Sequence, residues 1–277
     1  MTDAPDTEPA PQGRVLIIAG SDSSGGAGIQ ADIKAVTAMG GYAATAITAI
    51  TVQNTTGVSA VHGVPADIIA GQIEAVLSDI GADAIKTGMT ANITVVDTIL
   101  TALDKHADEL TPLIVDPVMV ATSGARLIDE DAVEAVRDRL IPRAALVTPN
   151  APEAAALTGL DVEDLDGQQA AAEALLDKGA RAALVKGGHL DGAVIVDVLA
   201  TSNGVRLFTR PRIQTRHTHG TGCTLASAAA ALIAQGLPLD KAVEKAGDYL
   251  HEAIKRAPGF GAGSGPVNHG WPLAGEI

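Results

Sequence analysis

The sequence predicts an α/β protein with a mostly parallel sheet covered by helices on both faces. Short apolar runs typical of buried strands alternate with helical segments along the chain. The length of 277 residues and the hydrophobic content of 47% suit one large domain. Several apolar runs end directly in polar clusters, and ligands bind beyond the carboxyl ends of parallel strands. We therefore expect these clusters to converge on one cleft.

In the first half of the chain, strands and helices follow each other without a linker. Strands are expected at residues 15–19, 43–51, 83–87 and 113–115. Helices are expected at residues 29–39, 65–79 and 92–105. Pro65 suits the first turn of its helix. The polar segment 52–58 is expected to be a loop or flap that closes over a ligand.

The second half continues the alternation. Helices are expected at residues 129–140, up to Gly159, and at residues 167–178, and strands at 144–147 and 182–185. The triplet Ser202–Gly204 predicts a hairpin between residues 193–200 and 205–210. Two Ala-rich helices and a Gly-rich tail follow. Residues 1–13 are expected to be a disordered lead-in, because they are polar, acidic and Pro-rich, and residues 14–277 a single domain.

Composition excludes several classes of function. The net charge of -14 and the aromatic content of 2% disfavour binding of nucleic acid. The single cysteine excludes an intrachain disulfide and a multi-cysteine metal site. No apolar run reaches the length of a membrane span. The cytoplasm is the expected compartment.

The segment His217–Leu225 carries the strongest chemical signal. Its glycines precede a helix of small residues, so free backbone N–H groups and the helix dipole can hold an anion there. Cys223 lies at the same helix end, where we expect a lowered thiol pKa and a role as base or nucleophile. The alternative is a glycine turn before a core helix, with Cys223 as a small buried residue.

Polar residues at other strand ends can complete a phosphoryl-transfer site. Asp116 follows a strand and suits a Mg²⁺ ion held partly through water. Asn150 and Glu153 can organise Mg²⁺ and phosphates, or form a helix capping box. Lys186 can meet a nucleotide phosphate, or is a surface charge. Asp32 can accept hydrogen bonds from a ligand amine, or is a solvated helix carboxylate.

Seven motifs occur in an order that resembles one family. They are residues 19–32, 52–55, 86–89, 116–119, 148–154, 186–189 and 219–223. Together they resemble the hydroxymethylpyrimidine/phosphomethylpyrimidine kinases of thiamine biosynthesis, of the ribokinase-like superfamily. The resemblance implies a three-layer α/β/α sandwich, often a homodimer. It also implies two ATP-dependent phosphorylations at one site, first of the hydroxymethyl group and then of the resulting monophosphate.

The resemblance also implies roles for individual residues. The pyrimidine pocket is expected to comprise Gly20, Asp32, Gln53, Met89 and Val118. ATP is expected near Asn150, Glu153 and Lys186, with Mg²⁺ at Asp116 and Glu153. The catalytic turn is expected to comprise Gly220, Thr221, Gly222 and Cys223, with Cys223 as the base or only as a shaping residue.

Two alternatives to a pyrimidine kinase stay open at this point. Some relatives with a cysteine at this position phosphorylate pyridoxal or pyridoxine, which are also flat rings with a hydroxymethyl group. The alternative from another class is a pyrimidine-binding sensor without catalysis. The presence of Cys223, Asn150 and Glu153 disfavours the sensor, because a sensor needs none of them.

Overall fold

The computed structural model describes residues 13–108, 110–120, 124 and 127–273. Residues 1–12 of the expected lead-in lie outside the described residues. Gly13, the last residue of that segment, already belongs to the fold, because its carbonyl accepts a hydrogen bond of 3.0 Å from the N–H of Tyr42.

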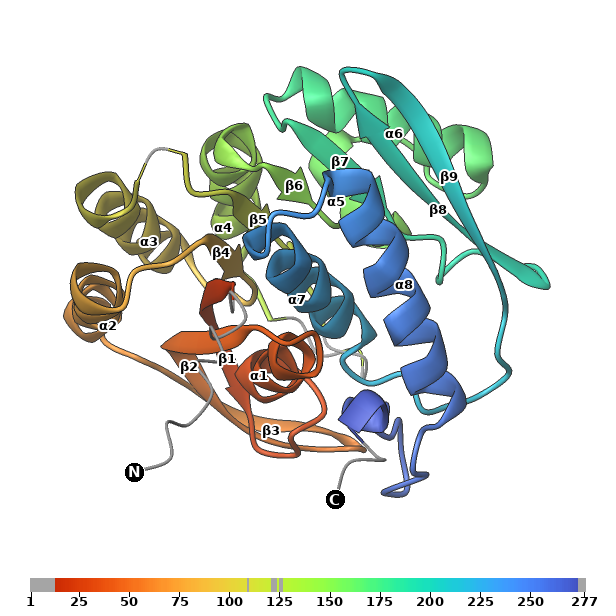
Figure 1. Cartoon of the computed structure of the whole chain (residues 1–277), viewed down its shortest axis with the longest axis horizontal. Helices are drawn as coiled ribbons and strands as arrows, with labels where there is room; N and C mark the ends of the chain where they lie inside the picture. Colours follow the sequence, from red (N-terminus) through yellow and green to blue (C-terminus); the bar gives the residue numbers. More distant parts are fainter. Residues whose placement is uncertain (1–12, 109, 121–123, 125–126, 274–277) are drawn as a thin grey trace, which may run out of the picture.

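The nine strands of the described chain form one sheet (Figure 1). Its order is β3-β2-β1-β4-β5-β6-β7-β8-β9. The strands are β1 (Arg14–Asp22), β2 (Tyr42–Asn54), β3 (Gly57–Gly63), β4 (Ala84–Thr87), β5 (Leu113–Val115), β6 (Leu146–Val147), β7 (Ala182–Val185), β8 (Val194–Thr201) and β9 (Gly204–Pro211). The six central strands, β2, β1, β4, β5, β6 and β7 in spatial order, pair in parallel. The outer pairings, β3 with β2, β7 with β8 and β8 with β9, are antiparallel.

Helices cover both faces of this sheet, as the sequence predicts. They are α1 (Gly28–Ala38), α2 (Ala66–Asp79), α3 (Ile93–His106), α4 (Glu130–Ala135), α5 (Ala151–Thr158), α6 (Leu165–Asp177), α7 (Thr221–Ala234) and α8 (Leu239–Lys255). One face carries α1, α7 and α8 side by side (Figure 1), and the other carries α2 to α6. The expected three-layer α/β/α sandwich is confirmed.

Alternating side chains of the central strands fill both cores. Leu16 and Ile18 of β1 pack into the core under α2 to α6, whereas Val15 and Ile17 pack into the core under α1 and α7. All four side chains are fully buried. Full burial of one such side chain stabilises the fold by roughly 1.5–3 kcal/mol. Strands buried on both faces are therefore continuous apolar runs, which is why the sequence shows them clearly.

Two segments differ from the sequence-based expectations. Residues 52–58, expected to form a loop or flap, are instead the tip of the β2–β3 hairpin. The helix expected over residues 129–140 ends as α4 at Ala135 and continues as a π-helical turn from Val136 to Leu140. The hairpin expected around Ser202–Gly204 is confirmed as β8 and β9.

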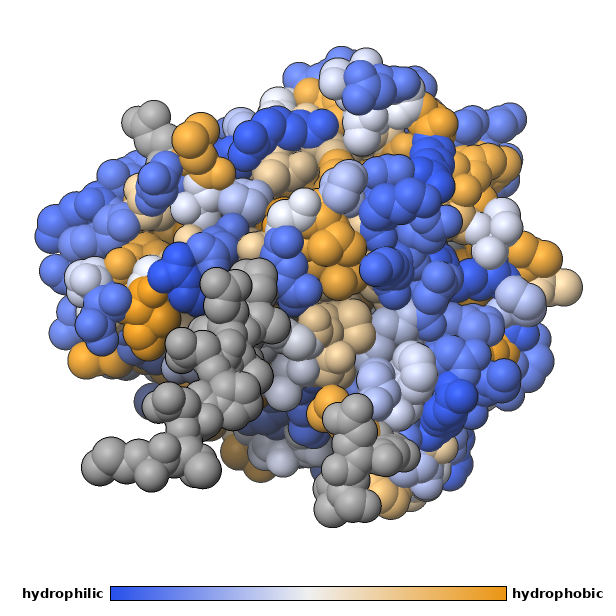
Figure 2. All heavy atoms as spheres, viewed as in Figure 1, coloured by the Kyte–Doolittle hydropathy of each residue, from blue (hydrophilic) through white to orange (hydrophobic). Residues whose placement is uncertain are grey.

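The outer face of α8 is hydrophilic where it meets solvent (Figure 2), and its inner face buries Val243 and Tyr249. This is the pattern of an amphipathic surface helix. Among the residues that the structure describes, no helix has the length and apolar character needed to cross a bilayer.

The sheet topology positions the functional site. The chain adds β2 on one side of β1 and then crosses to β4 on the other side. Such a switch point opens a crevice at the carboxyl ends of the strands. The loops after β1, β4, β5, β6 and β7 all meet there.

Candidate active site

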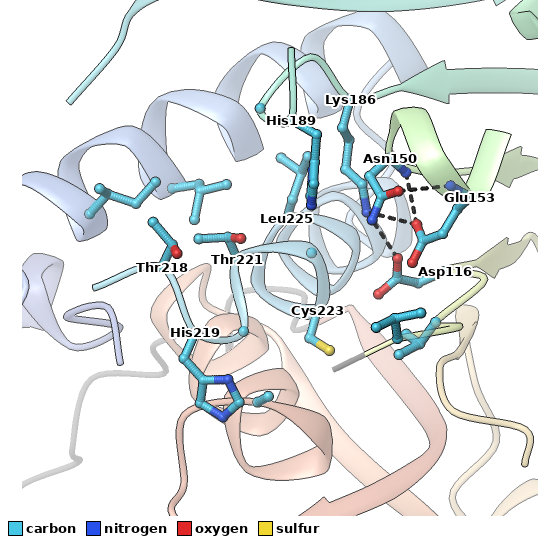
Figure 3. Close-up of a pocket in the computed structure, with 18 of the residues that line it drawn as sticks. Asp116, Asn150, Glu153, Lys186, His189, Thr218, His219, Thr221, Cys223 and Leu225 are labelled. Carbon is cyan, nitrogen blue, oxygen red and sulfur yellow. Dashed lines mark hydrogen bonds and ion pairs between the residues drawn. The ribbon is translucent and has the colours of Figure 1, made fainter. Parts of the chain in front are cut away.

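One cleft of about 780 Å³ lies at these strand ends and gathers nearly all the predicted site residues. Its lining includes Gly20, Gln53, Met89, Asp116, Val118, Asn150, Glu153, Lys186, Gly220, Thr221, Gly222 and Cys223. Figure 3 shows Cys223 at the floor of the cleft, with Asp116, Glu153 and Lys186 on one side and His219 on the other. The expectation that separate clusters converge on one cleft is confirmed.

The start of α7 forms the turn of residues 220–223, which the sequence predicts to bind an anion and which is called the anion-binding turn below. The helical hydrogen bonds begin with the Thr224 N–H, which donates to the Gly220 carbonyl at 2.9 Å, and the Thr221 N–H donates to the Thr218 carbonyl at 3.4 Å. The N–H groups of Gly222 and Cys223 lie between them in the first turn, where amides have no partner within the helix. Gly220 has φ +78°, and a Cβ there would lie 1.9 Å from the Gly26 carbonyl oxygen. Only glycine fits this close approach between the two loops.

Gly222 leaves open the space in which a phosphoryl group is expected. A Cβ at Gly222 would lie 3.2 Å from Lys186 Nζ and 3.8 Å from both carboxylate oxygens of Asp116. The missing side chain thus opens a gap between a helix N-terminus, an ammonium group and a carboxylate. These three features together suit a phosphate and its counter-ion.

Asp22 joins the loop after β1 to the anion-binding turn, a role that sequence reasoning missed. Its carboxylate accepts hydrogen bonds from the N–H groups of Ser24 at 2.8 Å and Ala27 at 2.8 Å. His219 Nε2 lies 2.8 Å from Asp22 Oδ2. Burial alone raises the pKa of Asp22, but the bonds from His219, Ser24 and Ala27 lower it to about 2. A polar residue inside a Gly/Ser loop was the available signal.

Asp22→Asn is expected to lower the free energy of unfolding by about 2 kcal/mol at pH 7. Because the folded pKa lies below the unfolded value, this stabilisation is present above about pH 4 and is lost as the pH falls towards about 2. Urea unfolding of wild type and variant at several pH values measures the gap between their free energies of unfolding. Asp191→Asn, at an exposed loop residue, is the control and should change little. A gap that does not shrink towards pH 2 contradicts the prediction.

Asp116, Glu153 and Lys186 form a largely buried charged cluster on one side of the cleft (Figure 3). Lys186 Nζ donates to Asp116 Oδ1 at 3.2 Å and lies 4.0 Å from Glu153 Oε2. Burial lowers the pKa of Lys186, but the two carboxylates outweigh it and raise the pKa. Burial raises the pKa of Glu153, and the attraction of Lys186 offsets part of that effect. The lysine is therefore a fixed cation at the centre of the cleft.

Asn150 and Glu153 form the capping box that the sequence left as an alternative. The Asn150 side chain accepts from the Glu153 N–H at 2.9 Å, and Glu153 Oε2 accepts from the Asn150 N–H at 2.8 Å. Both residues also line the cleft. The cap holds the Glu153 carboxylate near Lys186. The two residues can therefore cap the helix and also contribute to the site.

The acidic residues of this cluster fit a Mg²⁺ ion that keeps most of its water. Asp116 is buried, yet its Oδ2 atom has no hydrogen-bond partner. In the described part of the chain, no three His, Cys, Asp or Glu side chains are placed to hold a metal together. Mg²⁺ at nucleotide sites is usually bound through one or two carboxylates, phosphates and water. Asp116 and Glu153 match that pattern.

Cys223 differs from the sequence-based expectation in its acidity. Burial raises the pKa of the thiol to about 12, although Lys86 and the N–H of Gly28 act in the opposite direction. The helix N-terminus was expected to lower this pKa, but loss of hydration dominates in the closed floor of the cleft. The residue is therefore a neutral thiol near pH 7, which disfavours its expected role as base.

The alkylation rate of Cys223 by iodoacetamide is expected to rise about tenfold per pH unit from pH 7 to about 10, without a plateau. The reason is that only the thiolate reacts, and a raised pKa keeps its fraction small. Mass spectrometry follows the fraction of protein that carries one carbamidomethyl group, because Cys223 is the only cysteine. A plateau near pH 8 or 9 contradicts the prediction.

Asp32 does not line the cleft, which corrects the expectation that it contacts the pyrimidine. Its side chain is fully buried on the inner face of α1, where it accepts hydrogen bonds from Lys86 Nζ at 2.9 and 3.0 Å. Ser227 of α7 donates a further bond at 2.6 Å. Asp32 thus belongs to a buried network below the site.

The two ends of the cleft differ in character. Gly20, Gln53, Met89 and Val118 line one end, and a Cβ at Gly20 would lie 3.0 Å from the Met89 sulfur. The other end has apolar walls from α7, β8 and α8 that sequence reasoning missed. They are formed by Leu225, Ile195, Leu250 and Ile254. A small polar ring suits the first end, and a larger flat base suits the second.

Comparison with known proteins agrees with this geometry. The family profile described as phosphomethylpyrimidine kinase matches residues 22–268. The chain belongs to the phosphomethylpyrimidine kinase family. It is 43% identical to the hydroxymethylpyrimidine/phosphomethylpyrimidine kinase of Bacillus subtilis over 92% of this chain and 94% of that protein. It is also 49% identical to the thiamine biosynthesis bifunctional protein ThiED of Geobacter sulfurreducens, covering 94% of this chain but 53% of the relative.

Solved structures of this phosphomethylpyrimidine kinase family and of pyridoxal kinases share the fold. The phosphomethylpyrimidine kinase of Clostridium difficile has a TM-score of 0.78 at 42% identity, covering 88% of this chain and 100% of that one. The Bacillus subtilis pyridoxal kinase, solved as an ADP complex, has a TM-score of 0.87 at 32% identity, covering 96% and 100%.

Proposed function

We propose that the protein transfers the terminal phosphoryl group of ATP to 4-amino-5-hydroxymethyl-2-methylpyrimidine, and then to the resulting monophosphate, for thiamine biosynthesis. The observation that carries this proposal is the open space at Gly222. This space lies between the start of α7 and the Asp116–Lys186 pair. It belongs to a cleft that is also lined by Gln53, Met89 and Val118 and by Leu225, Leu250 and Ile254.

The substrates occupy opposite ends of the cleft in this proposal. Gln53 hydrogen-bonds the edge of the pyrimidine ring, and Met89 and Val118 contact its faces. ATP lies along Asn150 and Lys186, with its base against the apolar wall of α8. Binding both substrates in one cleft holds the acceptor oxygen in line with the terminal phosphorus.

Phosphoryl transfer then depends mainly on position and charge. A bond forms between the acceptor oxygen and phosphorus as the bond from phosphorus to the ADP oxygen breaks. In the first step the hydroxyl proton leaves late, to an oxygen of the transferred phosphoryl group and from there to solvent, because a loose transition state does not require an alkoxide. Lys186 and the N–H groups of Gly222 and Cys223 stabilise the negative charge on the transferred group. When bound at Asp116 and Glu153, Mg²⁺ supplies neutralisation of charge on the phosphates.

The proposal assigns Cys223 to charge stabilisation and shape rather than to proton removal. Its buried thiol is neutral near pH 7. In the second phosphorylation the acceptor is a phosphate that is already an anion, so no base is needed. A site built on charge stabilisation therefore serves both steps.

Pyridoxal kinase activity is the second candidate. Its support is the structural overlap with pyridoxal kinases, such as that of Staphylococcus aureus at a TM-score of 0.86 and 35% identity. Sequence identity is higher with the pyrimidine kinases, at 42–43% for the two reported above. The pyrimidine assignment is preferred for that reason.

ADP release from ATP and Mg²⁺ tests the proposal directly. The purified protein is assayed separately with hydroxymethylpyrimidine, its monophosphate and pyridoxal. Turnover of both pyrimidines, with pyridoxal slow, supports the assignment. Fastest turnover of pyridoxal moves the protein to vitamin B6 salvage, and binding of pyrimidine without turnover of any substrate supports the sensor. We also propose that the protein forms a homodimer and acts in the cytoplasm.

A further inference from the structure

Lys86 is a charged residue inside the core that the proposed reaction does not explain. Its side chain on β4 is fully buried, as is that of its partner Asp32 on α1. A buried ion pair adds little net stability, since apolar residues of similar volume stabilise a core as well or better. The pair therefore points to a role other than stability.

The position of Lys86 connects it to the active site. Lys86 lies near the carboxyl end of β4, next to β5, and Asp116 directly follows β5. Lys86 Nζ lies 3.9 Å from Asp116 Oδ2, which is the carboxylate oxygen without a hydrogen-bond partner. The neighbouring Gly88 keeps this region open, because a Cβ there would lie 3.1 Å from Lys86 Nζ.

The network below the cleft also reaches the anion-binding turn. Asp32, held by Lys86, accepts a hydrogen bond of 2.6 Å from Ser227. Ser227 lies four residues, about one helical turn, after Cys223 on α7. Helix α1, strand β4 and helix α7 are thereby joined beneath the site by one set of buried polar contacts.

We propose that Lys86 is a positioning residue for phosphoryl transfer, which holds the carboxylate of Asp116 from below while Lys186 holds it from the side. The two lysines fix the carboxylate between them, so that it keeps one orientation toward a phosphate-bound cation. The ammonium of Lys86 is also a permanent positive charge under the anion-binding turn, shielded from water. Fixed charges of this kind need no rearrangement during the reaction.

This inference rests on the proposed kinase function and is tested by removing the charged pair as a unit. Lys86→Met alone leaves Asp32 buried without its cation and can fail to fold. Lys86→Met/Asp32→Asn is neutral, similar in volume, and keeps an acceptor for Ser227. Lys86→Met/Asp32→Leu is a second neutral form, used where the first does not fold. Ser227→Ala is the matched control, because it removes one bond of the network but no charge.

We expect the neutral double variant to lose kcat but to keep its KM, both compared with the hydroxymethylpyrimidine kinase activity of the wild type. The neutral double variant should unfold at a temperature close to that of the wild type. Its kcat should fall about 10- to 100-fold, with little change in the KM for the pyrimidine, while Ser227→Ala keeps kcat within about threefold. A folded neutral variant with wild-type kcat overturns the proposal and leaves the pair a structural feature. Absence of turnover in the wild type itself would instead refute the proposed function.

Discussion

Gly222→Ala is expected to lower kcat by about 10²-fold or more without destabilising the protein. The added methyl group would stand 3.2 Å from Lys186 Nζ and 3.8 Å from the Asp116 carboxylate, in the space assigned to the transferred phosphoryl group. Its nearest neighbour is the end of a flexible side chain, so folding tolerates it. Alanine also favours the helix over glycine.

Gly71→Ala is the matched control for this prediction. Gly71 is exposed in α2, and a Cβ there meets no heavy atom within 4 Å. This variant should gain roughly 0.5–1 kcal/mol of stability and keep kcat. Steady-state assays and thermal unfolding of both variants provide the comparison. Turnover of Gly222→Ala within about threefold of wild type would show that the phosphoryl group passes elsewhere.

Asp116→Asn has the second large expected effect, a fall in kcat of about 10²- to 10³-fold. The change keeps the shape of the side chain but removes the negative charge next to Lys186 and Lys86, at 3.2 and 3.9 Å. The two lysines then repel a cation that the carboxylate attracts. We therefore expect the variant to need a higher Mg²⁺ concentration for half-maximal activity, measured by titration at saturating ATP.

Thr148→Val provides the control for Asp116→Asn. The Thr148 hydroxyl donates to Asp116 Oδ1 at 3.3 Å, so its loss disturbs the same carboxylate without changing its charge. The expected reduction in kcat is less than about tenfold. If Asp116→Asn kept the Mg²⁺ dependence of wild type, the metal would not be held at this residue.

The sequence predicts most of the fold because parallel strands buried on both faces are short apolar runs. Strand β4 and helix α2 were expected within about a residue of their observed bounds. Strand β3 was missed, because five of its seven residues are exposed and its sequence GVSAVHG lacks a clear alternation. An edge strand of this kind is fixed by its antiparallel pairing with β2 and not by local pattern.

The site was predictable where function requires a residue directly after a strand. Asp116 and Lys186 are of this type, and Asn150 follows β6 after two residues. The parallel topology brings the three together. The error at Asp32 has a different origin, because sequence alone does not show which face of α1 turns toward the core. The raised pKa of Cys223 likewise depends on its burial by other segments.

The apolar wall of the cleft was missed for the same reason, because it depends on contacts between distant segments. The apolar wall that we propose for the nucleotide base combines Leu225 of α7 with Ile195 of β8 and Ile254 of α8. These residues are ordinary core-type residues in the sequence. They meet at the cleft only because β8, α7 and α8 fold next to one another, which no local pattern reveals.

A time course that separates the pyrimidine monophosphate from the diphosphate tests the central claim most directly. The claim is that one anion-binding turn serves both phosphorylations. With ATP, Mg²⁺ and hydroxymethylpyrimidine, the wild type should form the monophosphate and then the diphosphate, and Gly222→Ala should lose both steps by similar factors. Retention of the second phosphorylation by Gly222→Ala, when the first is lost, would contradict a single shared site.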